Sequence, residues 1–241
     1  MTLIKIHTTT STNDALRLLI REDIPENFTT ISADFQTKGR GMQTNKWLSE
    51  SSKNLLFSTL IKHKQWSVKD GFKLNEMVSL ALVDVLSLYV KPILIKWPND
   101  ILADSKKIAG ILIENVIKGS HINYSIVGVG LNINQMTFKT LEKKATSLAI
   151  LTQKVYEPDD ILNQIIERFR FYFESTCHPH LHREYMDKLV GFQEYMFYKL
   201  NDGTLLKAKI TGVEPSGYLV LEDESGKRRS FDKKEVSWLD F

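Results

Sequence analysis

The sequence predicts an α+β fold, and three observations lead to this prediction. Short apolar segments typical of strands mix irregularly with long helical patterns, so a strict strand–helix–strand repeat is absent. From about residue 190 the chain changes to short alternating strands broken by "NDG", "PSG" and "ESG", which are hairpin signals. With 241 residues and 42% hydrophobic residues, the chain can bury one full core and a small second one. We therefore expect a first domain over 1–189 and a small five-stranded β-barrel over 190–241.

The first elements flank a long polar loop. "TLIKIH" predicts a strand, and "STNDALRLLIRED" predicts a helix that Ser11 or Thr12 can cap. "FTTISAD" and "NLLFSTLIK" are rich in Thr, Ile, Phe and Leu, which is typical of strands. The loop between them contains glycines and basic residues that cannot build a core.

The middle of the chain predicts further strands between two helices. "FKLNEMVSLALVDVLSLYV" is typical of a long buried helix, and "ILIKWP" predicts a strand that Pro98 ends. "KIAGILIEN" and "YSIVGVGLNIN" predict two more strands. Pro158 begins a helix with Ile161, Ile165 and Phe169 along one stripe. "HREYMDKLVG" predicts a helical hinge between the two domains.

Composition excludes several classes of protein. A net charge of +3 is too small and too dispersed to imply nucleic acid. The single cysteine, Cys177, permits neither an internal disulfide nor a cysteine-built metal site, and predicts a partly buried thiol in a reducing compartment. The start lacks the features of a signal peptide, and no apolar run approaches the ~20 residues that span a bilayer. We expect a soluble cytoplasmic protein without a membrane segment.

The strand "GVGLNIN" has one face without bulk. Val129, Leu131 and Ile133 point to one side and suit a core, whereas Gly128, Gly130 and Asn132 point to the other. Glycine inside a strand often marks a close approach of a ligand to the backbone. A bulge, or a helix packed tightly over the sheet, is the alternative explanation.

Two further segments carry chemistry-bearing residues. In "KKIAGILIEN", strict alternation places Lys107 with Ala109 and Ile111, and Gly110 with Leu112 and Glu114. Lys107 is either a solvated strand-end residue or an anchor for a carboxylate or phosphate oxygen. In "KWPND", Asn99 and Asp100 are either ordinary turn residues or ligand-binding groups. In the functional interpretation, Asp100 binds a metal or transfers a proton, and Asn99 forms a hydrogen bond to a polar ligand.

The loop "KGRGMQTNKW" predicts an anion-binding nest. Its glycines permit positive φ angles that turn backbone N–H groups inward, and Arg40 between them adds charge. The patterns "GxxxxGK[ST]" and "GxGxxG" are absent, so neither a Walker loop nor a dinucleotide fingerprint is present. A disordered basic connection is the alternative.

Taken together, these motifs resemble those of the biotin protein ligases. "GRGMQTNKW", "KWPND", "KIAGILIE" and "GVGLNIN" occur in the order and at the spacing of that family, and "STN" at Ser11 to Asn13 completes the set. The resemblance covers essentially the whole chain. It implies a mixed-sheet catalytic domain of the biotin/lipoate ligase type, followed by a C-terminal SH3-like barrel.

The resemblance also implies a reaction and its partners. Biotin and ATP, with Mg²⁺, would give biotinyl-5′-AMP, and a lysine of a biotin carboxyl carrier protein or domain would then accept biotin. The chain begins at the catalytic domain without the winged helix of the family's repressors, so we expect no DNA binding. We expect a monomer or a weak homodimer.

Site residues follow from the resemblance position by position. The implied catalytic residues are Lys107, Arg40 and Asp100, with Asp100 also serving the metal. The implied biotin-binding residues are Ser11, Thr12, Asn13, Gln36, Gly39, Arg40, Gly41, Met42, Lys107, Gly110 and Gly130. The implied ATP-binding residues are Trp47, Lys96, Asn99, Asp100 and Asn132.

The loop departs from the best-known bacterial pattern of the family, "GRGRRGR". Met42, Gln43, Thr44 and Asn45 follow Gly41 here, so arginine positions are lost and the adenylate is expected to escape more readily. The segment 37–46 is expected to be mobile without ligand.

Two alternative functions stay open. One is a lipoate or octanoate ligase or transferase of related fold, and the other is a non-catalytic biotin-binding sensor.

Overall fold

The computed structural model describes residues 2–42, 45–138, 144–175 and 179–239. The interpretation of Cys177 as a partly buried thiol lies outside the described residues, as do Gln43 and Thr44 of the loop.

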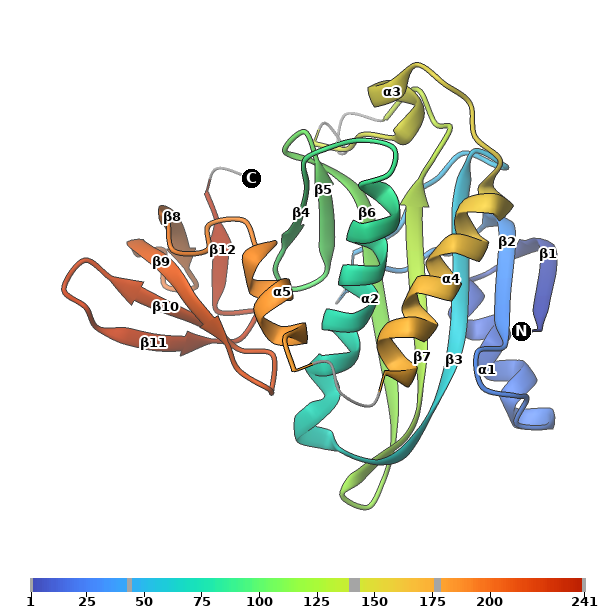
Figure 1. Ribbon diagram of the computed structural model, residues 1–241, viewed down its shortest axis with the longest axis horizontal. Coiled ribbons are helices and arrows are strands. Elements are labelled where there is room, and N and C mark those ends of the chain that lie inside the picture. The colour runs from blue at the N-terminus through green and yellow to red at the C-terminus, as the bar shows by residue number, and fades with distance from the viewer. Residues whose placement is uncertain (1, 43–44, 139–143, 176–178, 240–241) are drawn as a thin grey trace.

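A seven-stranded mixed sheet forms the body of the molecule (Figure 1). Its strands are β1 (Leu3–Thr9), β2 (Thr30–Gln36), β3 (Asn54–Ser67), β4 (Ile93–Lys96), β5 (Asp100–Ala103), β6 (Lys106–Lys118) and β7 (His121–Asn132). The spatial order is β1-β2-β3-β7-β6-β5-β4. β1 and β2 are parallel, and every other neighbouring pair is antiparallel. The α+β class predicted from the irregular order of elements is confirmed, and so is the mixed sheet that the family resemblance implies.

Helices cover the two faces of this sheet unequally. α2 (Gly71–Leu86) and α4 (Pro158–Glu174) pack on one face and form the large core with it. α1 (Thr12–Glu22) packs on the other face, where Leu16 and Ile20 meet Ile31, Leu60 and Ile126. η1 (Val68–Asp70), α3 (Leu148–Thr152) and α5 (Leu181–Asp187) are short connecting helices. α1 lies mainly against β2, β3 and β7, so the part of this face over β5 and most of β6 is left for other groups.

The alternation predicted for β7 is present. Val129 and Leu131 lie in the core with α2 and α4. A Cβ at Gly128 would meet Asn13 of α1, so the glycines of β7 face the α1 side of the sheet. The bulk-free face predicted from the sequence is thus the face that α2 and α4 do not cover.

The C-terminal part forms a separate antiparallel sheet, as predicted. Its strands are β8 (Tyr195–Leu200), β9 (Leu205–Val213), β10 (Leu219–Asp223), β11 (Arg228–Phe231) and β12 (Val236–Trp238). The order is β11-β10-β9-β8-β12. Trp97 Nε1 donates to Gly217 O at 3.0 Å, which ties this sheet to the main domain. The apolar core continues from one sheet to the other, and the boundary at 189/190 stays a prediction.

One strand was not predicted. β5 begins at Asp100 and pairs with β4, so "KWPND" forms the turn of a short hairpin. Asn and Asp are typical turn residues, so the sequence does not reveal the start of this four-residue strand.

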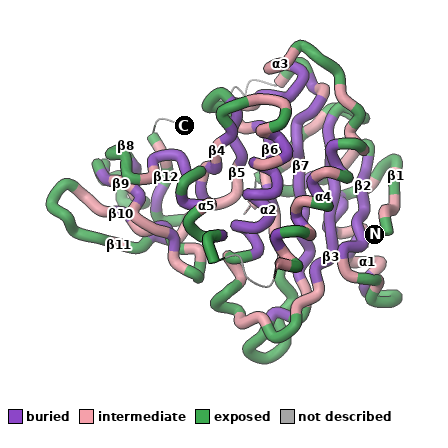
Figure 2. The backbone as a smooth tube through the Cα atoms, in the orientation of Figure 1, coloured by how far each residue is buried: buried purple, intermediate pink, exposed green. Residues whose placement is uncertain are grey.

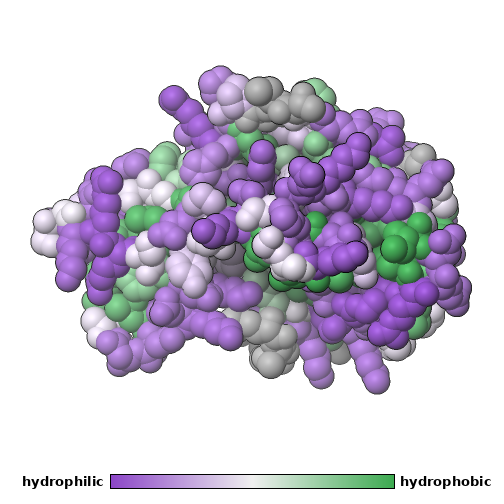
Figure 3. Space-filling view, turned by 90° about the horizontal axis from the view of Figure 1, so that it is seen from below, coloured by the Kyte–Doolittle hydropathy of each residue, from purple (hydrophilic) through white to green (hydrophobic). Residues whose placement is uncertain are grey.

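Burial is concentrated in the central strands and α2 (Figure 2). The face seen in Figure 3 is largely hydrophilic, with separate small apolar areas. No helix of the described residues is long and apolar enough to cross a membrane.

Candidate active site

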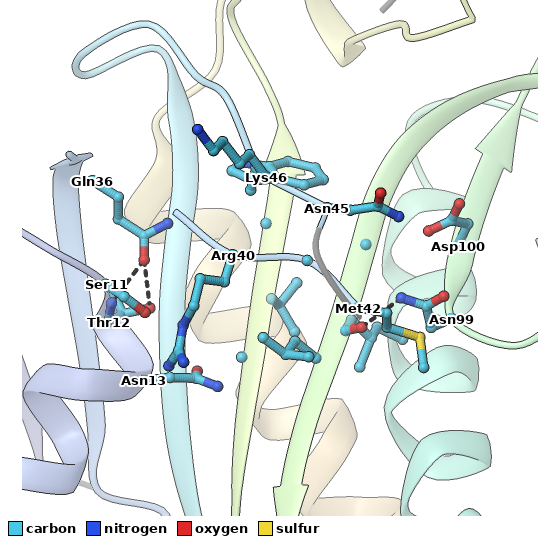
Figure 4. A pocket seen from close by; sticks show the side chains of 18 of the residues that line it. Ser11, Thr12, Asn13, Gln36, Arg40, Met42, Asn45, Lys46, Asn99 and Asp100 are labelled. Carbon is cyan, nitrogen blue, oxygen red and sulfur yellow. Dashed lines mark hydrogen bonds between the residues drawn. The ribbon is translucent and has the colours of Figure 1, made fainter. Parts of the chain in front are cut away.

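A pocket lies on the α1 side of the main sheet, between the start of α1, strands β6 and β7, and the glycine loop (Figure 4). The fold brings most of the predicted site residues to its wall. They are Ser11, Thr12, Asn13, Gln36, Arg40, Gly41, Met42, Trp47, Asn99, Asp100, Lys107, Gly110 and Gly130. Gly39, Lys96 and Asn132 were also predicted for the site but do not line this pocket.

The α1 end of the pocket is a connected polar wall. Gln36 Oε1 accepts hydrogen bonds from Thr12 N at 2.7 Å and from Thr12 Oγ1 at 3.1 Å. The first N–H groups of a helix lack intrahelical partners, and Gln36 at the end of β2 satisfies one of them. This contact turns the Gln36 amide nitrogen away from α1 and toward the loop (Figure 4). The amide is therefore oriented before any ligand is bound.

Asn13 is fixed on both sides of its amide. Its Nδ2 donates to Glu114 Oε2 at 2.7 Å. Ser58 Oγ lies 2.5 Å from Asn13 Oδ1 and 2.7 Å from Thr12 Oγ1, and can donate its proton to either. A Cβ at Gly128 would overlap Asn13 Oδ1, so a larger residue there would displace the Asn13 amide. Asn13 is only 3% exposed, and this buried amide has little freedom to change its orientation.

Sequence reasoning did not assign Ser58 or Glu114 to the site. Ser58 is fully buried in the middle of an apolar-looking strand, where a serine carries no sequence signal. Glu114 ends the quoted "KIAGILIE" segment and shares the alternation of Gly110, which is a signal that could have found it.

The described residues of the glycine loop, 39–42 and 45–47, pair with one another, and all of them except Gly39 lie at the pocket wall. Gly41 N donates to Asn45 O at 2.8 Å, and Trp47 N donates to Gly39 O at 3.0 Å. The mobility expected for 37–46 stays a prediction. The loop nevertheless has defined backbone pairs at its base and an aromatic anchor in Trp47.

Trp47 occupies space that the sequence analysis gave to a ligand. Alanine at Gly130 would overlap the indole at Cε2, and at Gly110 its Cβ would lie 3.2 Å from Cζ3. The missing side chains of these two glycines thus make room for the protein's own tryptophan. The indole Nε1 is buried, with no partner among the described residues. The implied role of Trp47 in binding ATP stays a prediction.

Lys107 lies at the other end of the pocket and is aimed there by a β-bulge. Leu102 pairs with Lys107 and Ile101 pairs with Ala109, so Ile108 is an extra residue in β6. Bulges re-aim side chains in this way. Lys107 Nζ accordingly lies 3.2 Å from the position that a Cβ on Gly110 would take. Lys107 thus shares the face of Gly110, whereas strict alternation predicted the opposite face. Its Nζ contacts Asp100 Oδ1 at 2.6 Å and lies 5.5 Å from the Trp47 ring centroid.

Arg40 does not join Lys107. Its NH2 lies 2.7 Å from Asp14 Oδ1 and 3.6 Å from Glu114 Oε1. In Figure 4 the side chain points toward Asn13, on the opposite side of the pocket from Asp100. The sequence interpretation placed Arg40 among the cations that face reacting anions. In this conformation two carboxylates neutralise it, because the fold brings α1 and β6 beneath the loop.

The residues predicted for ATP have structural partners of their own. Asn99 Nδ2 donates to Ile111 O at 2.7 Å, and Asn132 Nδ2 donates to Thr146 O at 3.0 Å. Lys96 pairs in register with Asp100 across the β4–β5 hairpin, and burial lowers the pKa of its ammonium. These contacts hold the backbone around Asp100 in shape.

A magnesium site built by protein alone is absent from the described residues, which contain no group of three or more His, Cys, Asp or Glu side chains suited to a metal. Mg²⁺ in nucleotide sites usually takes one or two carboxylates and completes its shell with phosphates and water. Asp100 lines the pocket and fits one such ligand position.

The fold and pocket define a known class of protein. The model of the biotin/lipoate A/B protein ligase family matches residues 6–132, which is more than half of the chain. The chain belongs to this family. The resemblance drawn from the sequence motifs is confirmed.

Similarity to particular members extends further along the chain. The bifunctional ligase/repressor BirA of Bacillus spizizenii is 27% identical over 238 residues, covering 92% of this chain and 69% of BirA. Biotin–protein ligase 2 of Arabidopsis thaliana is 30% identical over 218 residues, covering 82% of this chain and 63% of that protein. The solved biotin protein ligase of Aquifex aeolicus in complex with biotin and ATP has a TM-score of 0.80 and 27% identity, covering 98% and 97% of the two chains.

Proposed function

We propose that this protein is a biotin–protein ligase of the ATP-dependent, AMP-forming type. It activates biotin to biotinyl-5′-AMP and transfers biotin to a lysine of a biotin carboxyl carrier protein or domain. The observation that carries the proposal is the pocket, which joins a rigid polar wall at Thr12, Asn13 and Gln36 to a cationic end at Lys107. It lies in a fold closely similar to a ligase that was solved with biotin and ATP.

The polar wall suits the ring end of biotin. The fused ring of biotin carries a urea group, with one carbonyl acceptor and two N–H donors. Ser11, Thr12, Asn13 and Gln36 line this end and provide hydroxyl and amide groups of both kinds. Ser58 and Glu114 orient the side chains of Thr12 and Asn13 in advance, and Thr12 orients Gln36, which reduces the entropy lost on binding.

The Lys107 end suits the reacting groups. A carboxylate oxygen must attack the α-phosphorus of ATP while pyrophosphate leaves, so two anions approach each other. A positioned cation stabilises the charge that develops on the phosphate oxygens. Lys107 performs this role by exchanging its contact with Asp100 for a contact with the substrate oxygens. Mg²⁺, when bound, supplies further charge neutralisation at the phosphates, with Asp100 as its protein ligand.

Transfer of biotin completes the reaction. The amine of the acceptor lysine attacks the carbonyl carbon of the mixed anhydride, and AMP leaves. The carrier partner, the cytoplasmic location and the monomeric or weakly dimeric state accompany this proposal as predictions from the sequence.

Pyrophosphate release tests the first step, and mass spectrometry tests the second. The protein is incubated with MgATP and either biotin or lipoate, and then with a biotin carboxyl carrier domain. We expect pyrophosphate with biotin and a carrier mass increased by one biotinyl group. Pyrophosphate release with lipoate but not with biotin would support the lipoate ligase alternative. Biotin binding without pyrophosphate release would support the sensor alternative.

A further inference from the structure

Four charged side chains beside the pocket form a closed ring of ion pairs. Asp14 Oδ1 lies 2.7 Å from both Arg17 NH1 and Arg40 NH2. Glu114 Oε2 lies 2.9 Å from Arg17 NH2, and Glu114 Oε1 lies 3.6 Å from Arg40 NH2. Each arginine therefore meets both carboxylates, and each carboxylate meets both arginines.

This ring joins the glycine loop to α1 and β6. Arg40 belongs to the loop that covers the pocket, whereas Glu114 belongs to β6 beneath it. Asp14 and Arg17 lie three residues apart on α1, which places them on one face of that helix. These elements are distant in sequence, so the charges hold the loop against the rest of the fold.

The ring also reaches the pocket wall directly. Glu114 Oε2, which contacts Arg17, is the same oxygen that accepts the hydrogen bond from Asn13 Nδ2. Asn13 is buried and lines the pocket. A change of charge at Glu114 therefore acts at two places, on the position of the loop and on the orientation of Asn13.

The strength of the ring suits reversible closure. Its side chains are between 27% and 41% exposed, and ion pairs of this exposure contribute modestly and weaken with salt. A contribution of that size changes the balance between open and closed loop without deciding whether the chain folds. Met42 and Asn45 of the loop carry no charge, so Arg40 supplies the main electrostatic attachment among the described residues of the turn 39–45.

We propose that Asp14, Arg17 and Glu114 are positioning residues for biotin capture. They hold the loop closed over the Ser11–Asn13 end of the pocket and set the rate at which biotin leaves. They act through Arg40 and Asn13, without contacting the reacting groups at Lys107. The proposal rests on the biotin ligase function proposed above and adds residues outside the pocket wall to that site.

Hydrogen exchange in the ligand-free protein tests the attachment without requiring activity. The amides of Gly41 and Trp47 are hydrogen-bonded within the closed turn and report on its opening. In Glu114→Gln and in Arg17→Gln we expect both amides to exchange about five- to tenfold faster at low salt, with a smaller difference at high salt. Glu222→Gln is the matched control, because Glu222 also bridges two cations, Lys209 and Arg228, in the C-terminal sheet.

Biotin kinetics separate positioning from chemistry. We expect biotin to dissociate about five- to tenfold faster from both variants, with KM for biotin raised and kcat for pyrophosphate release unchanged at saturating biotin. Unchanged exchange and unchanged biotin dissociation in both variants would overturn the proposal. A lower Tm with parental exchange and parental dissociation would also overturn it, because the ring would then only stabilise the fold. If the parent protein binds no biotin, the proposed function fails, and the exchange result still decides whether the ring holds the loop.

Discussion

At the α1 end of the pocket, Thr12, Asn13 and Gln36 are held by buried and partly buried hydrogen bonds, whereas at the opposite end Lys107 has one charged partner, Asp100. The first end is organised before any ligand arrives. The second end keeps an ion pair that can be exchanged for substrate oxygens.

The difference matches the chemistry expected at each end. A neutral urea group is recognised by the direction of hydrogen bonds, so rigid donors and acceptors give affinity at low entropic cost. Reacting anions are stabilised by charge that strengthens as the transition state forms. We therefore expect changes at the Lys107 end to lower the rate of chemistry, and changes at the α1 end to lower biotin affinity.

The largest effect is expected from Lys107→Ala. Loss of an electrostatic contact to the reacting phosphate should reduce adenylate formation by about 10²–10³, while the melting temperature stays near that of the parent. Transfer from pre-made biotinyl-AMP should be less impaired, because that step no longer brings two anions together. Pyrophosphate release, calorimetry and carrier labelling measure the three quantities.

Two further variants sharpen this test. Lys207→Ala removes an ion-paired lysine of the C-terminal sheet and should leave adenylation unchanged. Lys107→Arg should not restore full activity, since Lys107 Nζ lies close over Gly110 and a planar guanidinium is wider. Near-parental adenylation in Lys107→Ala would remove Lys107 from the chemistry and leave Lys96 as the next cation to test.

An intermediate effect is expected from Gly128→Ala at the α1 end. The added methyl group would overlap Asn13 Oδ1, and the buried amide would have to move away from Ser58. Overpacking of this kind typically costs about 1–3 kcal/mol of unfolding free energy. Biotin affinity, measured by calorimetry, should fall with it, whereas kcat at saturating biotin should change little.

Gly212→Ala is the matched control for that variant. Gly212 also lies in a strand, but the nearest atom to an added Cβ is 3.8 Å away, so no overlap results. Its unfolding free energy should stay within about 0.5 kcal/mol of the parent. Parental biotin affinity in Gly128→Ala would show that the orientation of Asn13 does not matter for recognition.

The smallest effect is expected from Met42→Arg, which adds a cation to the loop above the Asn99 side of the pocket (Figure 4). A half-exposed charge contact to the adenylate is worth about 1 kcal/mol, so biotinyl-AMP should dissociate roughly fivefold more slowly. Release of labelled adenylate from the two proteins measures this. Met136→Arg, at an exposed methionine outside the pocket wall, is the control. Equal dissociation from Met42→Arg and the parent would show that the missing loop charge is unimportant.

The sequence alone determined the α+β class, the five-stranded C-terminal sheet and the bare face of β7. These features depend on local chemistry, since the period of two along a strand assigns Val129 and Leu131 to one side and the glycines to the other. Turn residues such as Gly217, whose φ is 92°, likewise indicate the position of a turn from the local sequence. Most of the residues that the ordered motifs named also line one pocket, and their roles there stay a prediction.

Only the tertiary structure decided where the charges of the site point. Strict alternation predicted that Lys107 points to the core side of the sheet. The bulge at Ile108 turns it to the other side, and this bulge arises only from the pairing of β6 with β5. Lys107 is also held by backbone hydrogen bonds to Lys144 and Thr146, which are remote in sequence. Arg40 meets Asp14 and Glu114 because the sheet brings α1 and β6 under one loop, at separations of 26 residues for the first contact and 74 for the second. A local pattern identifies which residues carry charge, but an ion pair forms between whichever groups the packed elements bring within reach.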